Sequence, residues 1–254
     1  MGNRKVWLFD LDDTLHDATG ATMRELRQAM GDYIERHLGL STAESNALRR
    51  RYWLRYGATL LGLVRHHGVE AGHFLDETHR LPGLEQRVHG HAHDLAALAR
   101  LRGRKFIVTN APAAYAARVL GVLGLRRAFD GVISIEDMHM FGDLRPKPDA
   151  RMLRALAARL RVPATRCVLV EDTLVHQKAA RRVGMGTVWM QRWLPRDESA
   201  GAPVPRRLRA WPPTAPARPR PQWVGATSRP GGNGYGSRRS RPQEGRAAGW
   251  AGSP

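Results

Sequence analysis

Cysteine is almost absent from this sequence, since Cys167 is the only one among 254 residues. A single thiol excludes an intramolecular disulfide and a cysteine-based zinc cluster, and it is typical of a reducing compartment. Long apolar runs are also missing. No stretch approaches the roughly 18 apolar residues that a membrane-spanning helix needs, and residues 1–10 lack the pattern of a secretory leader. We therefore expect a cytoplasmic protein with no membrane partner.

Acidic residues are scarce, because 23 Asp and Glu stand against 41 Lys and Arg, giving a net charge of +18. Such an excess favours a polyanionic partner. Residues 196–254, however, carry 11 arginines against three acids and are rich in Pro, Gly, Ala and Ser. Without hydrophobic periodicity they cannot offset their ordering entropy, so we predict a disordered basic tail over 195–254. With few aromatics, this tail is expected to bind polyanions weakly and without selectivity, and not a specific nucleic acid.

The rest of the chain contains short, continuous apolar runs. These runs predict strands that are buried on both faces of a parallel sheet. They lie at 5–10, 106–109, 132–135, 167–170 and 187–190. Helical patterns at 113–123, 149–160 and 174–183 separate the later runs and suit right-handed crossovers. The sequence therefore predicts an α/β fold with a doubly wound parallel sheet, whose ligands bind at the carboxyl ends of the strands.

The first crossover is far too long, because roughly ninety residues separate the first two runs where about a dozen would suffice. Residues 19–80 show helical apolar spacing and no strand pattern. We predict an inserted all-helical cap over 17–90 and an α/β core formed by 1–16 and 91–194. The cap is expected to stand over the carboxyl edge of the sheet.

Two carboxylates, Asp10 and Asp12, directly follow the first predicted strand. Their alternation directs both toward one pocket, where their charge needs compensation. Hard oxygen ligands of this kind suit Mg²⁺ far better than zinc or copper. The alternative is that Asp10–Thr14 is a turn whose side chains cap a helix.

Other polar groups fall at the ends of the other predicted strands. Thr109 and Asn110 follow the second strand, and Glu171 and Asp172 end the fourth. Lys147 comes shortly before a predicted helix whose first turn contains Pro148, so an ammonium and helix amides are expected to meet one anion.

Taken together, these four motifs resemble those of the haloacid dehalogenase-like hydrolases, in order, from Asp10 to about Met190. The resemblance implies that Asp10 is the nucleophile that forms an aspartyl-phosphate and that Asp12 is the general acid and base. It implies Mg²⁺ held by Asp10, the Asp12 carbonyl and Asp172, with Glu171 as a further ligand.

The same resemblance implies that Thr109, Lys147 and the backbone of Asn110 hold the phosphoryl oxygens. The second Asp favours a phosphatase over a dehalogenase, because a departing halide needs no proton. One departure is His176, which stands where many relatives have Asn or Asp four residues after the metal-binding Asp. A neutral His also donates a hydrogen bond, so we expect a change in metal affinity or pH dependence.

The cap segment Tyr56–Leu63, His79 and the run Thr109–Ala111 resemble the pyrimidine 5′-nucleotidase group. This implies a pyrimidine nucleoside 5′-monophosphate as the leading substrate, with Tyr56, Thr59 and His79 as its contacts. The alternatives are another small phosphorylated metabolite, such as phosphoglycolate or a sugar phosphate, and a catalytically weak core whose basic tail binds nucleic acid. The sequence leaves the oligomeric state open.

Other clusters are expected to be structural. His89, His91 and His93 are predicted to be exposed residues of a linker, and the aromatics Tyr33, Tyr52 and Trp53 are predicted to lie in the core.

Overall fold

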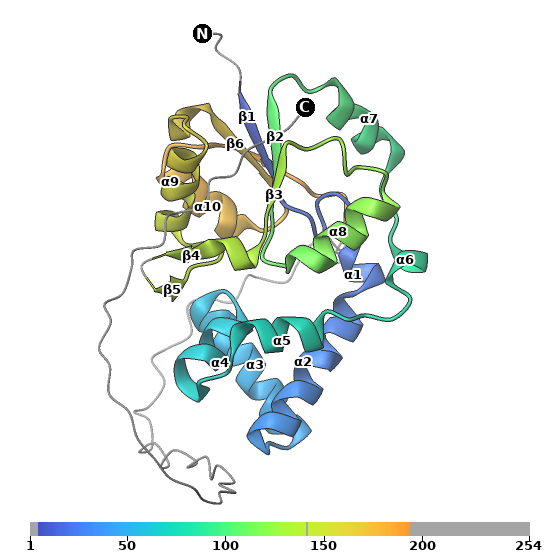
Figure 1. The fold of residues 1–254 in the computed structure, drawn as a ribbon, viewed down its shortest axis with the longest axis vertical. Helices are drawn as coiled ribbons and strands as arrows, with labels where there is room; N and C mark the ends of the chain where they lie inside the picture. The colour runs from blue at the N-terminus through green and yellow to red at the C-terminus, as the bar shows by residue number, and fades with distance from the viewer. Residues whose placement is uncertain (1–4, 141, 194–254) are drawn as a thin grey trace, which may run out of the picture. The chain divides into compact units, whose positions relative to one another are not determined.

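The computed structural model describes residues 5–140 and 142–193, so the predicted tail at 195–254 lies outside the described residues. Its centre is a five-stranded sheet in the order β3-β2-β1-β6-β7, in which every neighbouring pair is parallel (Figure 1). The strands are β1 (Val6–Phe9), β2 (Arg104–Val108), β3 (Gly131–Ile133), β6 (Cys167–Glu171) and β7 (Gly186–Trp189). The predicted parallel α/β fold is confirmed.

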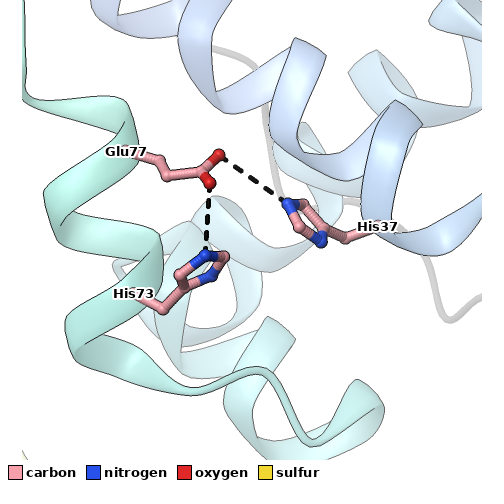
Figure 2. Close-up of side chains that lie close together, drawn as sticks. All are labelled: His37, His73 and Glu77. Atoms are coloured by element: carbon pink, nitrogen blue, oxygen red, sulfur yellow. Dashed lines mark ion pairs between the residues drawn. The ribbon is translucent and has the colours of Figure 1, made fainter.

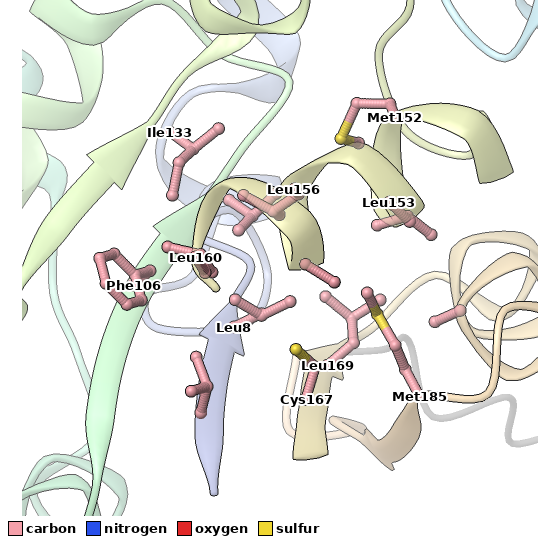
Figure 3. Packing of buried hydrophobic residues seen from close by; sticks show 14 of the residues in the cluster. Leu8, Phe106, Ile133, Met152, Leu153, Leu156, Leu160, Cys167, Leu169 and Met185 are labelled. Carbon is pink, nitrogen blue, oxygen red and sulfur yellow. The ribbon is translucent and has the colours of Figure 1, made fainter. Parts of the chain in front are cut away.

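Helices from the core cover both faces of the sheet, as a doubly wound fold requires. They are α7 (Ala92–Arg100), α8 (Ala113–Val122), α9 (Ala150–Arg159) and α10 (Leu174–Arg182). One apolar cluster joins Leu8 of the central strand to residues of α9 and α10, and Figure 3 shows Leu153 and Leu156 packed over Leu8 and Leu169. A second cluster joins Phe9 to α7 and α8. Because successive residues of β1 face opposite clusters, the strand is buried on both sides.

Several boundaries differ from the prediction. Ile135 begins a 3₁₀ turn, η1 (Ile135–Met138), and is not part of a strand. An unpredicted antiparallel pair follows, β4 (His139–Met140) and β5 (Asp143–Leu144). A second short 3₁₀ turn, η2 (Ala164–Arg166), precedes β6. Pro148 was expected in the first turn of a helix, but α9 begins only at Ala150 and Asp149 is its N-cap. That expectation is wrong because the Asp149 side chain, which accepts from Arg151 N at 2.8 Å, starts the helix instead.

Between β1 and α7 the described chain forms helices and no strand. They are α1 (Ala18–Ala21), α2 (Met23–Leu38), α3 (Thr42–Tyr56), α4 (Thr59–His67), α5 (Ala71–Thr78) and α6 (Leu84–Arg87). A capping box of Ser41 and Glu44 starts α3. Among the described residues, no helix is both long and apolar enough to cross a bilayer. The predicted helical insertion is therefore present.

The inserted helices have their own apolar cluster, which includes Tyr33 of α2, Tyr52 of α3 and Phe74 of α5. The prediction that Tyr33 and Tyr52 lie in the core is confirmed. For Trp53 it is wrong, because this side chain is 61% exposed. Adjacent positions on a helix point about 100° apart, so Tyr52 and Trp53 cannot both face the same core.

The packing of α3 on α4 depends on Gly62. A Cβ atom added there would lie 2.1 Å from the ring carbon Cγ of Tyr52, closer than two carbon atoms that are not bonded to each other can approach. Gly31 of α2 is also buried and helical, yet a Cβ added there would meet nothing nearer than Ser45 Oγ at 3.7 Å, an ordinary contact.

We predict that Gly62→Ala lowers the free energy of unfolding by about 1–3 kcal/mol, because Tyr52 must move out of its packed position. Gly31→Ala is the matched control. It should leave stability unchanged or raise it by up to about 1 kcal/mol, since alanine is the better helix former. Urea unfolding followed by circular dichroism checks both, and equal effects of the two substitutions would contradict the close packing at Gly62.

Candidate active site

The candidate catalytic residues follow the carboxyl ends of the central strands. Asp10 comes directly after β1 and its amide still donates to Val170 O of β6 at 2.9 Å. Thr109 follows β2 and its amide donates to Ile133 O of β3 at 3.0 Å. Glu171 is the last residue of β6. The sheet ladder therefore fixes the backbone at the point where each side chain leaves it.

A buried ammonium group lies at the centre of this edge. Lys147 Nζ is 2.7 Å from Asp10 Oδ1 and 2.8 Å from Glu171 Oε2. The three side chains are 1%, 10% and 0% exposed, respectively. Charges this deeply buried need partners, and each of these has one. Lys147 thereby links Asp10, which follows β1, to Glu171 at the end of β6.

The pKa values of the three groups follow from this arrangement. Burial, followed by the charge of Glu171, raises the pKa of Asp10 well above its usual value, although Lys147 opposes the shift. Burial also works to raise the pKa of Glu171, but Lys147 and His176 outweigh it and hold that pKa far below the usual range. Burial works to lower the pKa of Lys147, yet the two carboxylates raise it, so the amine stays protonated.

Asn110 positions Lys147 through the backbone. Its amide Nδ2 donates to Lys147 O, and Lys147 N donates to Asn110 Oδ1, both at 3.0 Å. The side chain of Asn110 is thus used in holding the backbone of Lys147. The expectation that α9 amides and the ammonium meet one anion stays a prediction, and of these amides Arg151 N already donates to Asp149 Oδ1 at 2.8 Å. Thr109 is buried, and its hydroxyl oxygen accepts from Ala111 N at 3.0 Å.

Asp12 is held by two residues that the sequence analysis missed. The Tyr115 hydroxyl donates to Asp12 Oδ1 at 2.7 Å, and Nε2 of the fully buried His16 lies 3.0 Å from the same oxygen. Burial works to raise the pKa of Asp12, but the hydrogen bonds from His16 and Tyr115 lower it overall. Burial and the charge of Asp12 raise the pKa of Tyr115, so its hydroxyl remains a donor. Asp12 Oδ2 is left as the oxygen available for chemistry.

Three carboxylates are grouped closely enough to hold a cation. One oxygen each from Asp10, Glu171 and Asp172 lie within 4.8 Å of one another. Burial and the neighbouring Glu171 raise the pKa of Asp172 to about 7, because a single ammonium does not balance this much negative charge. An all-oxygen donor set with surplus negative charge fits Mg²⁺. His176 Nδ1 lies 3.1 Å from Glu171 Oε1, so the histidine contacts the cluster from α10.

The three cap residues that were predicted to contact the substrate have different surroundings in the structure. The loop between α3 and α4 approaches the segment that contains Lys147 and Pro148, since a Cβ added at Gly57 would lie 2.9 Å from Pro148 Cδ. The His79 ring packs edge-on against Tyr115, with centroids 5.9 Å apart, which places it next to the residue that holds Asp12. The Tyr56 hydroxyl, in contrast, pairs with His66 Nε2, and Thr59 is buried with its hydroxyl 3.5 Å from Arg49 O. Of these residues, only His79 is thereby linked to the carboxylate site.

The histidines at 89, 91 and 93 do not join this site. His89 and His93 are exposed, as predicted, whereas His91 is half-buried as the N-cap of α7. The helix begins at Ala92, so His93 lies in its first turn and not in a linker.

Comparison with known proteins agrees with this arrangement. The family model of the haloacid dehalogenase-like hydrolases matches residues 5–184, and the chain belongs to this family of hydrolases. It is similar to phosphate metabolism protein 8 of Saccharomyces cerevisiae, with 23% identity over 195 residues, which cover 73% of this chain. The match spans 61% of the yeast protein's length.

Two solved structures show the same fold. A phosphatase of this family from Thermococcus onnurineus has 24% identity and a TM-score of 0.50, over 78% of this chain and 89% of the other. A Lactobacillus plantarum protein classed as a phosphoglycolate phosphatase has 15% identity and a TM-score of 0.52, over 74% of this chain and 86% of the other. At such low identity the likeness concerns the fold alone.

We predict that Lys147→Gln lowers the free energy of unfolding at pH 7 by about 3–5 kcal/mol, because Asp10 and Glu171 then face each other without a counter-charge. The pKa of Asp10 in the folded state is already raised, and the substitution raises it further. A group with a raised folded pKa binds protons on folding, so the deficit relative to wild type should shrink as the pH falls through that pKa.

Urea unfolding from pH 8 down to pH 5 in the presence of a chelator checks this. Lys178→Gln, on α10 and outside the cluster, is the matched control. A deficit that stays constant with pH would contradict the account of the charges.

Proposed function

We propose that this protein is a Mg²⁺-dependent phosphomonoester hydrolase that acts through an aspartyl-phosphate on Asp10. The observation that carries the proposal is the buried ammonium of Lys147, 2.7 Å from Asp10 Oδ1, beside a second carboxylate, Asp12, that is anchored at one oxygen. A leaving alkoxide needs a proton and a leaving halide does not, so an anchored Asp12 supports phosphate ester cleavage over dehalogenation.

In this mechanism an Asp10 oxygen attacks phosphorus, and the bond from phosphorus to the ester oxygen breaks. Lys147 lies where it attracts the phosphoryl oxygens while it orients the nucleophile. The departing oxygen takes a proton from Asp12, which later removes a proton from the water that hydrolyses the aspartyl-phosphate. The pKa of Asp12 is low in the free protein, and a phosphate dianion beside it raises that pKa, because like charge disfavours the carboxylate.

Mg²⁺ would be held by Asp10, Asp172 and the backbone carbonyl of Asp12, and it would neutralise charge between the nucleophile and the phosphate. Glu171 is the weaker candidate ligand. Its Oε2 is paired with Lys147, and its Oε1 accepts from Thr173 N at 3.2 Å. Asp172 is therefore the carboxylate that is freer to bind a metal.

For the substrate we propose a pyrimidine nucleoside 5′-monophosphate, with phosphoglycolate or a sugar phosphate as the alternative small metabolite. The cap supports a substrate that extends beyond its phosphate, because the Gly57 loop reaches Pro148 and His79 reaches Tyr115. Burial lowers the pKa of His79, so a neutral imidazole faces the site and suits hydrogen bonding to an uncharged group such as a base.

The test is phosphate release from a panel of pyrimidine and purine monophosphates, sugar phosphates and phosphoglycolate, with Mg²⁺ or with a chelator. We predict Mg²⁺-dependent release that falls to background in Asp10→Asn and that is highest with a pyrimidine nucleotide. Asp32→Asn, an exposed residue of α2, is the isosteric control and should behave as wild type. Full activity in Asp10→Asn would overturn the mechanism, whereas a different best substrate would overturn only the nucleotide assignment.

We also predict that Asp12→Asn lowers kcat by about 10²- to 10⁴-fold, the usual contribution of general acid–base catalysis. Tyr115→Phe removes one hydrogen bond to a charged group and should lower kcat by about 10- to 100-fold with KM nearly unchanged. Steady-state kinetics on the best substrate measure both. A Tyr115→Phe enzyme with normal kcat would show that the anchoring of Asp12 has no part in the reaction.

A further inference from the structure

A second group of metal-ligating side chains lies in the helical insertion, on the outer parts of α2 and α5. Figure 2 shows His73 and Glu77 on one helix facing His37 on the other. One ligand atom from each of the three lies within 4.8 Å of the others. The group shares no residue with the carboxylate cluster of Asp10, Glu171 and Asp172, and two of its three candidate ligands are imidazoles.

We propose that His37, His73 and Glu77 bind a Zn²⁺ ion that joins α2 to α5. His73 Nε2 is 3.2 Å from Glu77 Oε1, and His37 Nε2 is 3.7 Å from Glu77 Oε2. Ligands about 2.0–2.2 Å from a tetrahedral zinc ion lie roughly 3.3 Å from each other, so both of these separations are close to what a shared ion requires. Two imidazoles and one carboxylate form a common zinc donor set, with water in the fourth position.

The orientation of His73 supports a ligand role. Its Nδ1 lies 2.9 Å from the hydroxyl oxygen of Tyr33, a residue that is itself buried. In the tautomer whose Nδ1–H donates to that oxygen, the lone pair of Nε2 points toward Glu77 and is free for a metal. Protein zinc ligands usually have such an outer partner, which fixes the tautomer and the ring orientation.

The surroundings of Glu77 also suit a cation. The Glu77 side chain is 20% exposed, and burial opposes its ionisation, but Arg36, His73 and His37 lower its pKa overall. The carboxylate is therefore ionised and already attracts positive charge. Arg36 Nη2 lies 3.2 Å from Glu77 Oε2 and competes for that oxygen, yet its side chain is 63% exposed and is free to swing into solvent. The histidine side chains are 38% and 48% exposed, which leaves a path for the ion.

The experiment is Zn²⁺ titration of the full chain by calorimetry, with millimolar Mg²⁺ present to compete at the carboxylate site. Co²⁺ absorption spectra then report whether nitrogen ligands are bound. We expect one zinc site in wild type that is weakened at least about tenfold in His37→Ala and in Glu77→Gln, since each substitution removes a ligand. Tyr33→Phe should weaken it by about 10- to 100-fold, the usual effect of losing an outer partner.

Two further variants keep the test decisive. Arg36→Gln removes a competitor whose side chain is 63% exposed, so it should tighten Zn²⁺ binding. His93→Ala is the matched control from the 89–93 histidines and should leave the affinity unchanged. The proposal is overturned if wild type binds no Zn²⁺, if Arg36→Gln has no effect, or if His93→Ala weakens binding while His37→Ala does not.

Discussion

One buried ion-pair network holds the active-site edge together. Lys147 balances Asp10 at the end of β1 and Glu171 at the end of β6, and the Asn110 side chain holds the lysine backbone from the segment after β2. Removing the charge of Lys147 would leave two buried carboxylates without this counter-charge, at a cost of several kcal/mol. The contacts that hold Asp10, the proposed nucleophile, therefore also keep three distant segments of the chain in place.

The network also explains how two aspartates, only two residues apart, come to differ. Burial and Glu171 push the pKa of Asp10 up, whereas His16 and Tyr115 pull the pKa of Asp12 down. Paired acids whose surroundings shift their pKa values in opposite directions are suited to different roles in one reaction. The two side chains themselves are identical, so the difference comes from their neighbours, which are contributed by β6, by α8 and by the turn after β1.

Much of this could be predicted from the sequence, because its signals are local. Continuous apolar runs ending in Asp10 and Glu171 located the central strands and the edge where the carboxylates gather. The partners of Asp12 could not be found in this way. His16 stands in a turn without periodicity, and Tyr115 is separated from Asp12 by the whole helical insertion. The prediction for Trp53 was wrong for a different reason. A large aromatic residue beside a buried tyrosine was expected in the core, but the helix turns it outward and it is exposed. Local patterns specify elements, while contacts between elements depend on packing that a single sequence does not display.

The position of β1 at the middle of the sheet has a consequence for biosynthesis. Its Leu8 pairs with Phe106 on one side and with Leu169 on the other, so β1 has no sheet neighbour until about a hundred further residues have been made. Helices α2 to α5, in contrast, pack on near neighbours in sequence and can assemble while translation continues. The nascent chain thus carries an apolar strand that lacks one of its sheet neighbours until β6 emerges, and Asp10 lacks its counter-charge until Lys147 emerges. An apolar strand that pairs only with distant segments stays exposed during synthesis and is prone to aggregation. We therefore expect chaperones to bind the nascent chain at this strand.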